Sequence, residues 1–158
     1  MKRRQFIKNT AACGTLLSLP FPSASRLFAA NLSSDLTDLS ASDLSHAIRT
    51  KQASCVEVMQ AYLDRIHRYN PVYNAIVSMV SDDELLKQAL HADQALARNE
   101  YWGWLHGMPH AIKDLAPVAG MPYTSGSPMF ANRIAEEDGA FVAKIRSQGA
   151  IFIGKTNT

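Results

Sequence analysis

A chain of 158 residues is long enough for one domain with a substantial core, since ordinary domains have roughly 100 to 150 residues. Its 47% hydrophobic and 19% charged residues are typical of a packed globular protein and exclude a wholly disordered chain. The net charge of +2 is small and partly due to basic residues among the first eight positions, so we expect no nucleic-acid partner. The two cysteines predict no internal disulfide framework, because Cys13 lies in a segment that we expect to be removed.

Residues 1–30 have the layout of an export signal. Basic residues come first, a weakly apolar run from about Thr10 to Leu19 follows, and a stretch rich in small residues comes after it. The apolar run is about half of the roughly 20 residues that cross a bilayer, so we expect no stable membrane span. Arg3 and Arg4, followed by Gln-Phe-Ile-Lys, resemble the signal read by the twin-arginine export machinery. The sequence thus predicts export to the periplasm or the medium, with an unclear cleavage site.

Two other interpretations of this segment are less favoured. A lipid anchor on Cys13 is disfavoured because Leu16, Leu17 and Leu19 of the apolar run still follow it. A basic, amphipathic segment that stays on the protein is the other alternative. The remaining residues, 31–158, are expected to form one domain.

Three helix starts are legible in the first half of this domain. Ser40, Ser54 and Ser81 each precede an acidic residue by three positions, the spacing of a side-chain cap. We expect helices to begin at these serines, the second ending at Tyr69 before Asn70-Pro71 and the third ending near Arg98. The run from Ala75 to Val80 is expected to be a strand.

The second half alternates loops, strands and one helix. Glycines and prolines between positions 101 and 128 predict turns around a short apolar run, Ala111-Ile112, that leads into Lys113. Asp138 is expected to cap a helix that stops at Gly149, and the residues 150–153 form a fully apolar strand. The alternation predicts an α/β fold with a layered sheet.

The apolar strand at 150–153 lies almost at the end of the sequence. A buried parallel strand needs a crossover and a neighbour, and neither follows it here. We therefore expect a truncated protein or a fragment, and poor solubility from an unpaired apolar edge.

Lys113 is the candidate catalytic residue. A lysine at the end of an apolar run is expected to be partly desolvated, which favours its neutral form and suits a general base. Asp114 would oppose this if the two side chains pair. Spacing alone is weak support, because a Lys-Asp pair is most often a solvated turn.

A series of ordered segments strengthens this assignment. Residues 105–114, Leu-His-Gly-Met-Pro-His-Ala-Ile-Lys-Asp, resemble the first block of the amidase signature family. Further matching segments follow in the family's order, at 119–122, 124–128, 137–142 and 149–157, and the resemblance covers residues from about 36 to 158. Several linked blocks are far more specific than one.

The resemblance implies an incomplete three-layer α/β/α amidase-signature fold and a Ser/cis-Ser/Lys mechanism on carbon-nitrogen amide bonds, or on esters. In that mechanism the lysine accepts the proton of a nucleophilic serine through a bridging serine, and a small-molecule amide is the substrate. Lys113 alone of these groups has a match, because the serine block is expected beyond Thr158. The resemblance implies no cofactor and no metal, and the chain by itself should be inactive.

Three motifs have simpler explanations. Residues 149–156 fit the pattern G-x-x-x-x-G-K-T of a phosphate-binding loop, but the four middle residues are themselves the expected strand. His106 and His110 suggest a metal pair, but the intervening Gly107 and Pro109 disfavour a helix that would bring them together. Ser127 lacks a nucleophile motif and is expected to be a turn residue near the active-site cleft.

Two other functions stay open. One is a noncatalytic exported module that binds a partner through the helices between Ser40 and Arg98. The other is a relative of an amidotransferase component that acts on a charged transfer RNA, which an export signal disfavours.

Overall fold

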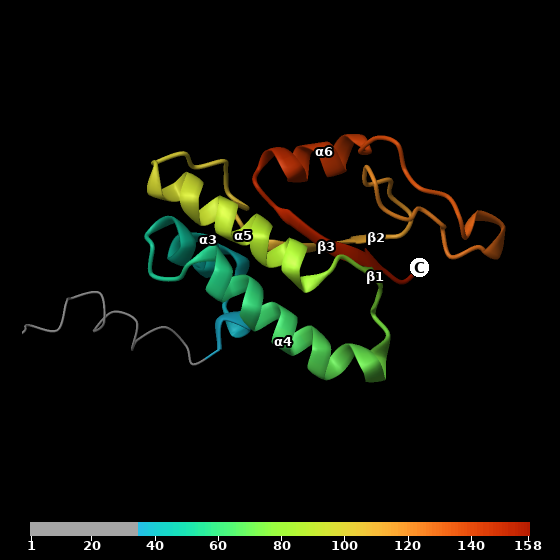
Figure 1. Cartoon of the computed structure of the whole chain (residues 1–158), viewed down its shortest axis with the longest axis horizontal. Coiled ribbons are helices and arrows are strands. Elements are labelled where there is room, and N and C mark those ends of the chain that lie inside the picture. Colours follow the sequence, from blue (N-terminus) through green and yellow to red (C-terminus); the bar gives the residue numbers. More distant parts are fainter. Residues whose placement is uncertain (1–34) are drawn as a thin grey trace, which may run out of the picture. The chain divides into compact units, whose positions relative to one another are not determined.

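The computed structural model describes residues 35–158, so the predicted export signal lies outside the described residues. Nine elements follow one another along this part of the chain. Figure 1 labels the α-helices and the strands among them. In order they are η3 (Leu36–Asp38), α3 (Ala41–Arg49), α4 (Cys55–Tyr73), β1 (Ile76–Met79), α5 (Asp82–Ala97), β2 (Pro109–Lys113), η4 (Pro128–Phe130), α6 (Ala140–Ser147) and β3 (Ile151–Thr156).

The three strands form one mixed sheet in the order β1-β3-β2. β3 pairs antiparallel with β1 and parallel with β2, with Ile112 opposite Lys155 and Lys113 opposite Thr156. The prediction that the last strand is an unpaired apolar edge is therefore wrong, because β3 is the central strand and has a partner on each side. Because β3 is not an unpaired edge, it gives no reason to expect poor solubility.

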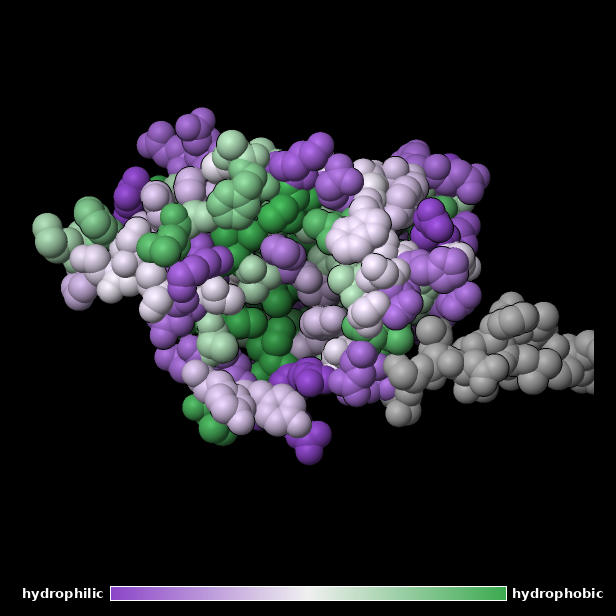
Figure 2. Space-filling view, turned by 180° about the vertical axis from the view of Figure 1, so that it is seen from behind, coloured by the Kyte–Doolittle hydropathy of each residue, from purple (hydrophilic) through white to green (hydrophobic). Residues whose placement is uncertain are grey.

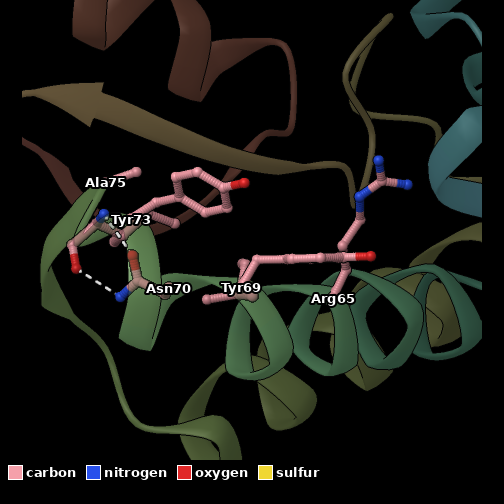
Figure 3. Close-up of a pocket in the computed structure, with 7 residues that line it drawn as sticks. Arg65, Tyr69, Asn70, Tyr73 and Ala75 are labelled. Carbon is pink, nitrogen blue, oxygen red and sulfur yellow. Dashed lines mark hydrogen bonds between the residues drawn. The ribbon is translucent and has the colours of Figure 1, made fainter.

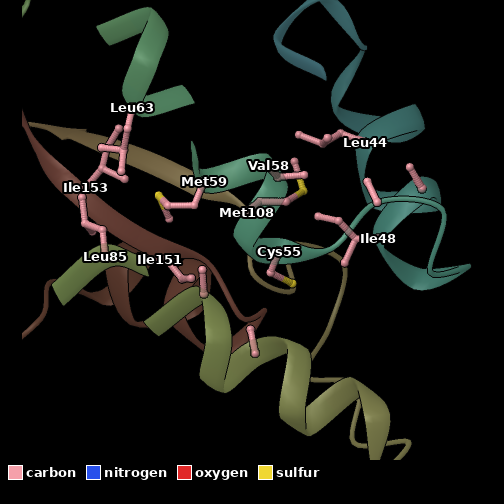
Figure 4. Packing of buried hydrophobic residues seen from close by; sticks show 14 of the residues in the cluster. Leu44, Ile48, Cys55, Val58, Met59, Leu63, Leu85, Met108, Ile151 and Ile153 are labelled. Atoms are coloured by element: carbon pink, nitrogen blue, oxygen red, sulfur yellow. The ribbon is translucent and has the colours of Figure 1, made fainter. Parts of the chain in front are cut away.

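Helices cover both faces of the sheet, as a three-layer α/β/α arrangement requires (Figure 1). On one face, Ile151 and Ile153 of β3 pack in a core with α3, α4 and α5 (Figure 4). On the other face, Phe152 packs with Ile112 and with Val142 of α6. Side chains alternate between the faces of a strand, so the apolar residues 151–153 of β3 contribute to two cores at once.

Side-chain caps start the first two helices as the sequence predicts. The Ser40 hydroxyl accepts a hydrogen bond from the Asp43 amide, and Ser54 and Glu57 form a reciprocal capping box. Ser81 does precede α5, but its side chain makes no capping bond there. The cap assigned to Asp138 is wrong, because α6 begins after Gly139. Asp138 instead pairs with Arg146 and accepts a bond from the Ala119 amide, so its carboxylate is committed to tertiary contacts.

The end of α4 also differs from the prediction. The helix continues through Pro71 and ends at Tyr73, with Asn74 in the left-handed conformation as its cap. Pro71 stands in the last turn, where its missing N–H costs a single helical bond. The Asn70 side chain then donates to the Ile76 carbonyl and accepts from the Ile76 amide, both at 2.9 Å. These bonds fix the turn from helix into strand.

Part of the surface is apolar. Figure 2 shows green hydrophobic residues gathered across the middle of one face, with hydrophilic residues around them. Val72, Tyr73 and Met129 are 78%, 72% and 87% exposed. Exposed apolar surface often marks a place where another part of a protein packs.

Candidate active site

Lys113 is the last residue of β2 and lies at the carboxyl ends of the two parallel strands. Its side chain is exposed, and its Nζ donates a hydrogen bond to the Asn157 carbonyl at 3.1 Å. The expectation of partial desolvation is wrong for the described residues, because β2 is an outer strand and its end opens to solvent. Ligand sites in α/β sheets commonly lie at this carboxyl edge.

Asp114 follows Lys113 and turns inward. It is 4% exposed, and its amide donates to the Thr156 carbonyl at 3.1 Å. Its carboxylate accepts hydrogen bonds from the Thr124 amide, at 3.0 and 3.2 Å, and from the Thr124 hydroxyl. Its carbonyl accepts from the Ser125 amide at 3.0 Å. One residue thus joins the end of β2 to a turn ten positions further on.

This turn, residues 124–126, lies against the end of β3. Ser125 has a positive φ of 53°, and a Cβ placed on Gly126 would lie 3.0 Å from the Thr158 Cβ. The structure therefore brings Lys113, Asn157 and the turn 124–126 to the same edge of the sheet. Sequence reasoning did not assign a site role to Asp114 or Thr124, and the proximity of the two follows from folding rather than from spacing.

Ser127 lies next to the same turn. Its hydroxyl accepts a hydrogen bond from the Met129 amide at 3.3 Å and caps η4. It is the turn residue that the sequence predicts. Among residues 35–158 no hydrogen bond joins Lys113 to a serine hydroxyl.

Lys155, one strand away, is the lysine that the fold removes from solvent. Its side chain is 0% exposed, and burial lowers its pKa while Asp114 opposes the shift. Its Nζ donates to the Ala116 carbonyl and lies 3.9 Å from Asp114 Oδ1. The apparent phosphate-loop motif is excluded here, because Gly154, Lys155 and Thr156 are strand residues.

The two histidines near Lys113 have separate structural contacts. His106 Nδ1 accepts from the Trp102 amide at 3.1 Å, so Nε2 carries the proton and donates to the Ala92 carbonyl at 3.0 Å. His110 packs edge-on against the Phe152 ring. Burial lowers the pKa of both imidazoles, which favours their neutral forms. Within residues 35–158 no cluster of three or more His, Cys, Asp or Glu could hold a metal ion.

A pocket of about 470 Å³ lies elsewhere, between the end of α4 and β1 (Figure 3). Tyr69, Tyr73 and Ile76 contribute to an apolar lining, and Arg65 stands at one end. The Asn70 side chain in its wall makes two hydrogen bonds to the Ile76 backbone. The lining of this pocket includes no serine, cysteine, lysine, histidine or carboxylate.

None of the helices in the described part of the chain is long and apolar enough to cross a bilayer.

Comparison with known proteins identifies the family of this chain. The Amidase family model matches residues 57–158, and the chain belongs to this family. The chain is 41% identical over 119 residues to indoleacetamide hydrolase of Bradyrhizobium diazoefficiens, and 35% over 126 residues to an amidase of Pseudomonas putida. It is also 40% identical over 123 residues to one of the subunits of the glutamyl-tRNA(Gln) amidotransferase of Carboxydothermus hydrogenoformans.

These matches cover most of this chain but little of each relative. They take in 75%, 79% and 78% of the chain, and 22%, 26% and 25% of the three relatives in the same order. The chain therefore spans about a quarter of the length of the relatives that it matches.

A solved structure shows the same fold. The peptide amidase of Stenotrophomonas maltophilia matches with a TM-score of 0.67 and 29% identity, over 76% of this chain and 25% of that one. The incomplete α/β/α amidase fold expected from the sequence is thereby confirmed.

Proposed function

We propose that this chain supplies the lysine base of an amidase that hydrolyses carbon-nitrogen amide bonds. The observation that carries the proposal is the placement of Lys113, with its exposed amine fixed by Asn157 at the carboxyl edge of a parallel strand pair. In the complete enzyme, further chain packed over this edge would withdraw the Lys113 amine from water and favour its neutral form, which can accept a proton. Membership of the Amidase family supports this role for Lys113.

The reaction needs two serines that lie outside the described site. A nucleophilic serine would attack the amide carbonyl while its proton passes through a bridging serine to the neutral Lys113 amine. The proton then goes to the departing nitrogen, and water hydrolyses the acyl-enzyme by the same proton path in reverse. The turn 124–126 would border this space. Since the chain spans about a quarter of its relatives, the remaining length is where we place both serines.

Replacement of Lys113 tests the proposal in the complete enzyme. Removal of a general base should lower kcat by roughly 10²- to 10⁴-fold, so Lys113→Ala should lose hydrolysis of a small acyl p-nitroanilide by that factor. Lys144→Ala is the matched control, because Lys144 is an exposed lysine on α6. Turnover by Lys113→Ala at the rate of the control would refute the assignment. The 158-residue chain alone should show no turnover.

Two of the candidate functions differ in where the nitrogen released from the amide goes. A hydrolase releases the acid and the amine with water, whereas an amidotransferase passes ammonia to a charged transfer RNA. We favour the hydrolase because the predicted export signal would carry the protein away from transfer RNA. The noncatalytic helical module is less favoured, since the family match includes all three strands of the described sheet as well as α5, α6 and most of α4.

Export is a separate part of the proposal and rests on residues 1–30 alone. Replacement of Arg3 and Arg4 together by lysine should block transport by a twin-arginine system, so the protein should accumulate in the cytoplasm of a fractionated host. Equal periplasmic amounts for both versions would contradict this route.

A further inference from the structure

Lys155 is a charged side chain in a place that would suit an apolar one. It belongs to the central strand, its side chain is 0% exposed, and Ile112 is its paired neighbour on β2. The neighbouring core on this face is built from apolar residues, including Val118 and Phe152. Removing an ammonium from water costs several kcal/mol unless close partners compensate.

Its partners all come from one segment. The ammonium donates to the Ala116 carbonyl, lies 3.9 Å from Asp114 Oδ1, and stands 5.9 Å from the centre of the Tyr123 ring. These three groups belong to residues 114–123, which directly follow Lys113. The Lys155 ammonium on the central strand β3 thus contacts the loop 114–123, which follows the outer strand β2.

Asp114 extends this attachment to the site. A carboxylate that faces a buried cation keeps one orientation, and here that orientation presents its oxygens to the Thr124 amide and hydroxyl. The Asp114 carbonyl meanwhile accepts a hydrogen bond from the Ser125 amide, and the Asp114 amide donates one to the Thr156 carbonyl. The path Lys155, Asp114, Thr124 therefore runs from the core to the turn beside Lys113.

We infer that Lys155 is a positioning residue, whose buried ammonium holds Asp114 and through it keeps the turn 124–126 against the strand ends that carry Lys113. It touches no substrate. The inference rests on the proposed function only in that Lys113 defines the site. Methionine would fill much of the same volume, so the substitution Lys155→Met removes the charge with little change in packing.

Amide hydrogen exchange in the 158-residue chain tests this directly. Lys155→Met should speed exchange of the Thr124 and Ser125 amides at least tenfold. The Val80 amide, which bonds the Ile153 carbonyl at 3.0 Å on the other side of β3, should keep its rate. Lys144→Met is the matched control and should change none of these amides. Unchanged Thr124 and Ser125 rates in a folded Lys155→Met chain would overturn the inference.

A titration of the unsubstituted chain covers the case in which Lys155→Met does not fold. Asp114 and Tyr123 are the ionisable groups that the described residues place beside Lys155. As pH rises, the Thr124 methyl signal should move together with the Lys155 Cε signal, because a neutral amine no longer orients Asp114. A Thr124 signal that ignores deprotonation of Lys155 would contradict the path. Neither the hydrogen exchange nor the titration requires turnover, so their results do not depend on the outcome for Lys113→Ala.

Discussion

Replacement of Gly107 by alanine should destabilise the fold through two separable effects. Gly107 has a φ of +70°, and a Cβ built there would lie 2.2 Å from the Cys55 Sγ and 2.8 Å from the Cys55 Cβ. A left-handed conformation costs an L-residue about 1 to 2 kcal/mol, and an added methyl group in a packed core costs about 1 to 3 kcal/mol. From the two effects combined we expect a loss of about 2 to 5 kcal/mol in the free energy of unfolding.

The clash has little room to relax. Cys55 is 0% exposed at the start of α4, and its amide is tied to the Asp93 carboxylate at 2.7 Å. Gly107 itself is held by a hydrogen bond that its backbone N–H donates to the Gly149 carbonyl at 2.9 Å. Both backbones are therefore fixed, and the upper part of the range is favoured.

Gly120→Ala separates the two effects. Gly120 has a similar φ of +78°, but a Cβ there meets nothing within 4 Å, so only the backbone cost of about 1 to 2 kcal/mol should appear. Urea unfolding followed by tryptophan fluorescence gives both values. In a double-mutant cycle, Cys55→Ala should relieve part of the clash in Gly107→Ala, with a coupling of about 0.5 to 3 kcal/mol. Equal costs for the two glycines, with no coupling to Cys55, would refute this reasoning.

Three further predictions concern the helix cap and two buried or paired charges. Ser54→Ala breaks the capping box of α4 and should cost about 1 kcal/mol in urea unfolding, whereas Ser42→Ala, at an exposed position on α3, should cost less. Because burial lowers the pKa of Lys155 below its ordinary 10.5, the unfolded chain binds more protons between that lowered value and 10.5. The free energy of unfolding should rise with pH in this window, and a Lys155→Met chain that shows the same rise would contradict it. The Arg146 guanidinium lowers the pKa of Asp138 below 3.8, so stability from this pair is present above pH 3.8 and is lost as pH falls below it. Asp138→Asn should flatten that acid limb of the unfolding curve, and an unchanged limb would argue against the pair.

Local signals in the sequence were sufficient for much of the secondary structure. The capping serines, Ser40 and Ser54, placed the starts of α3 and α4 because a cap depends on residues three positions apart. The apolar run at 150–153 indicated a strand with both faces buried, and β3 has apolar side chains in both cores. The end of α4 was misplaced because the residue before a proline is only disfavoured in a helix, and Pro71 in the last turn removes a single helical hydrogen bond.

The sequence by itself determined the family, the α/β character and the candidate base, since ordered blocks and local periodicity lie within short stretches of chain. The tertiary structure decided which strand is central, and thereby which lysine is buried. Lys113 and Lys155 are 42 positions apart, and each follows a run of apolar residues. Only the pairing order β1-β3-β2 gives Lys113 an open edge and Lys155 neighbours on both sides. Strand order depends on contacts between distant residues, so no local pattern could distinguish the exposed amine from the buried one.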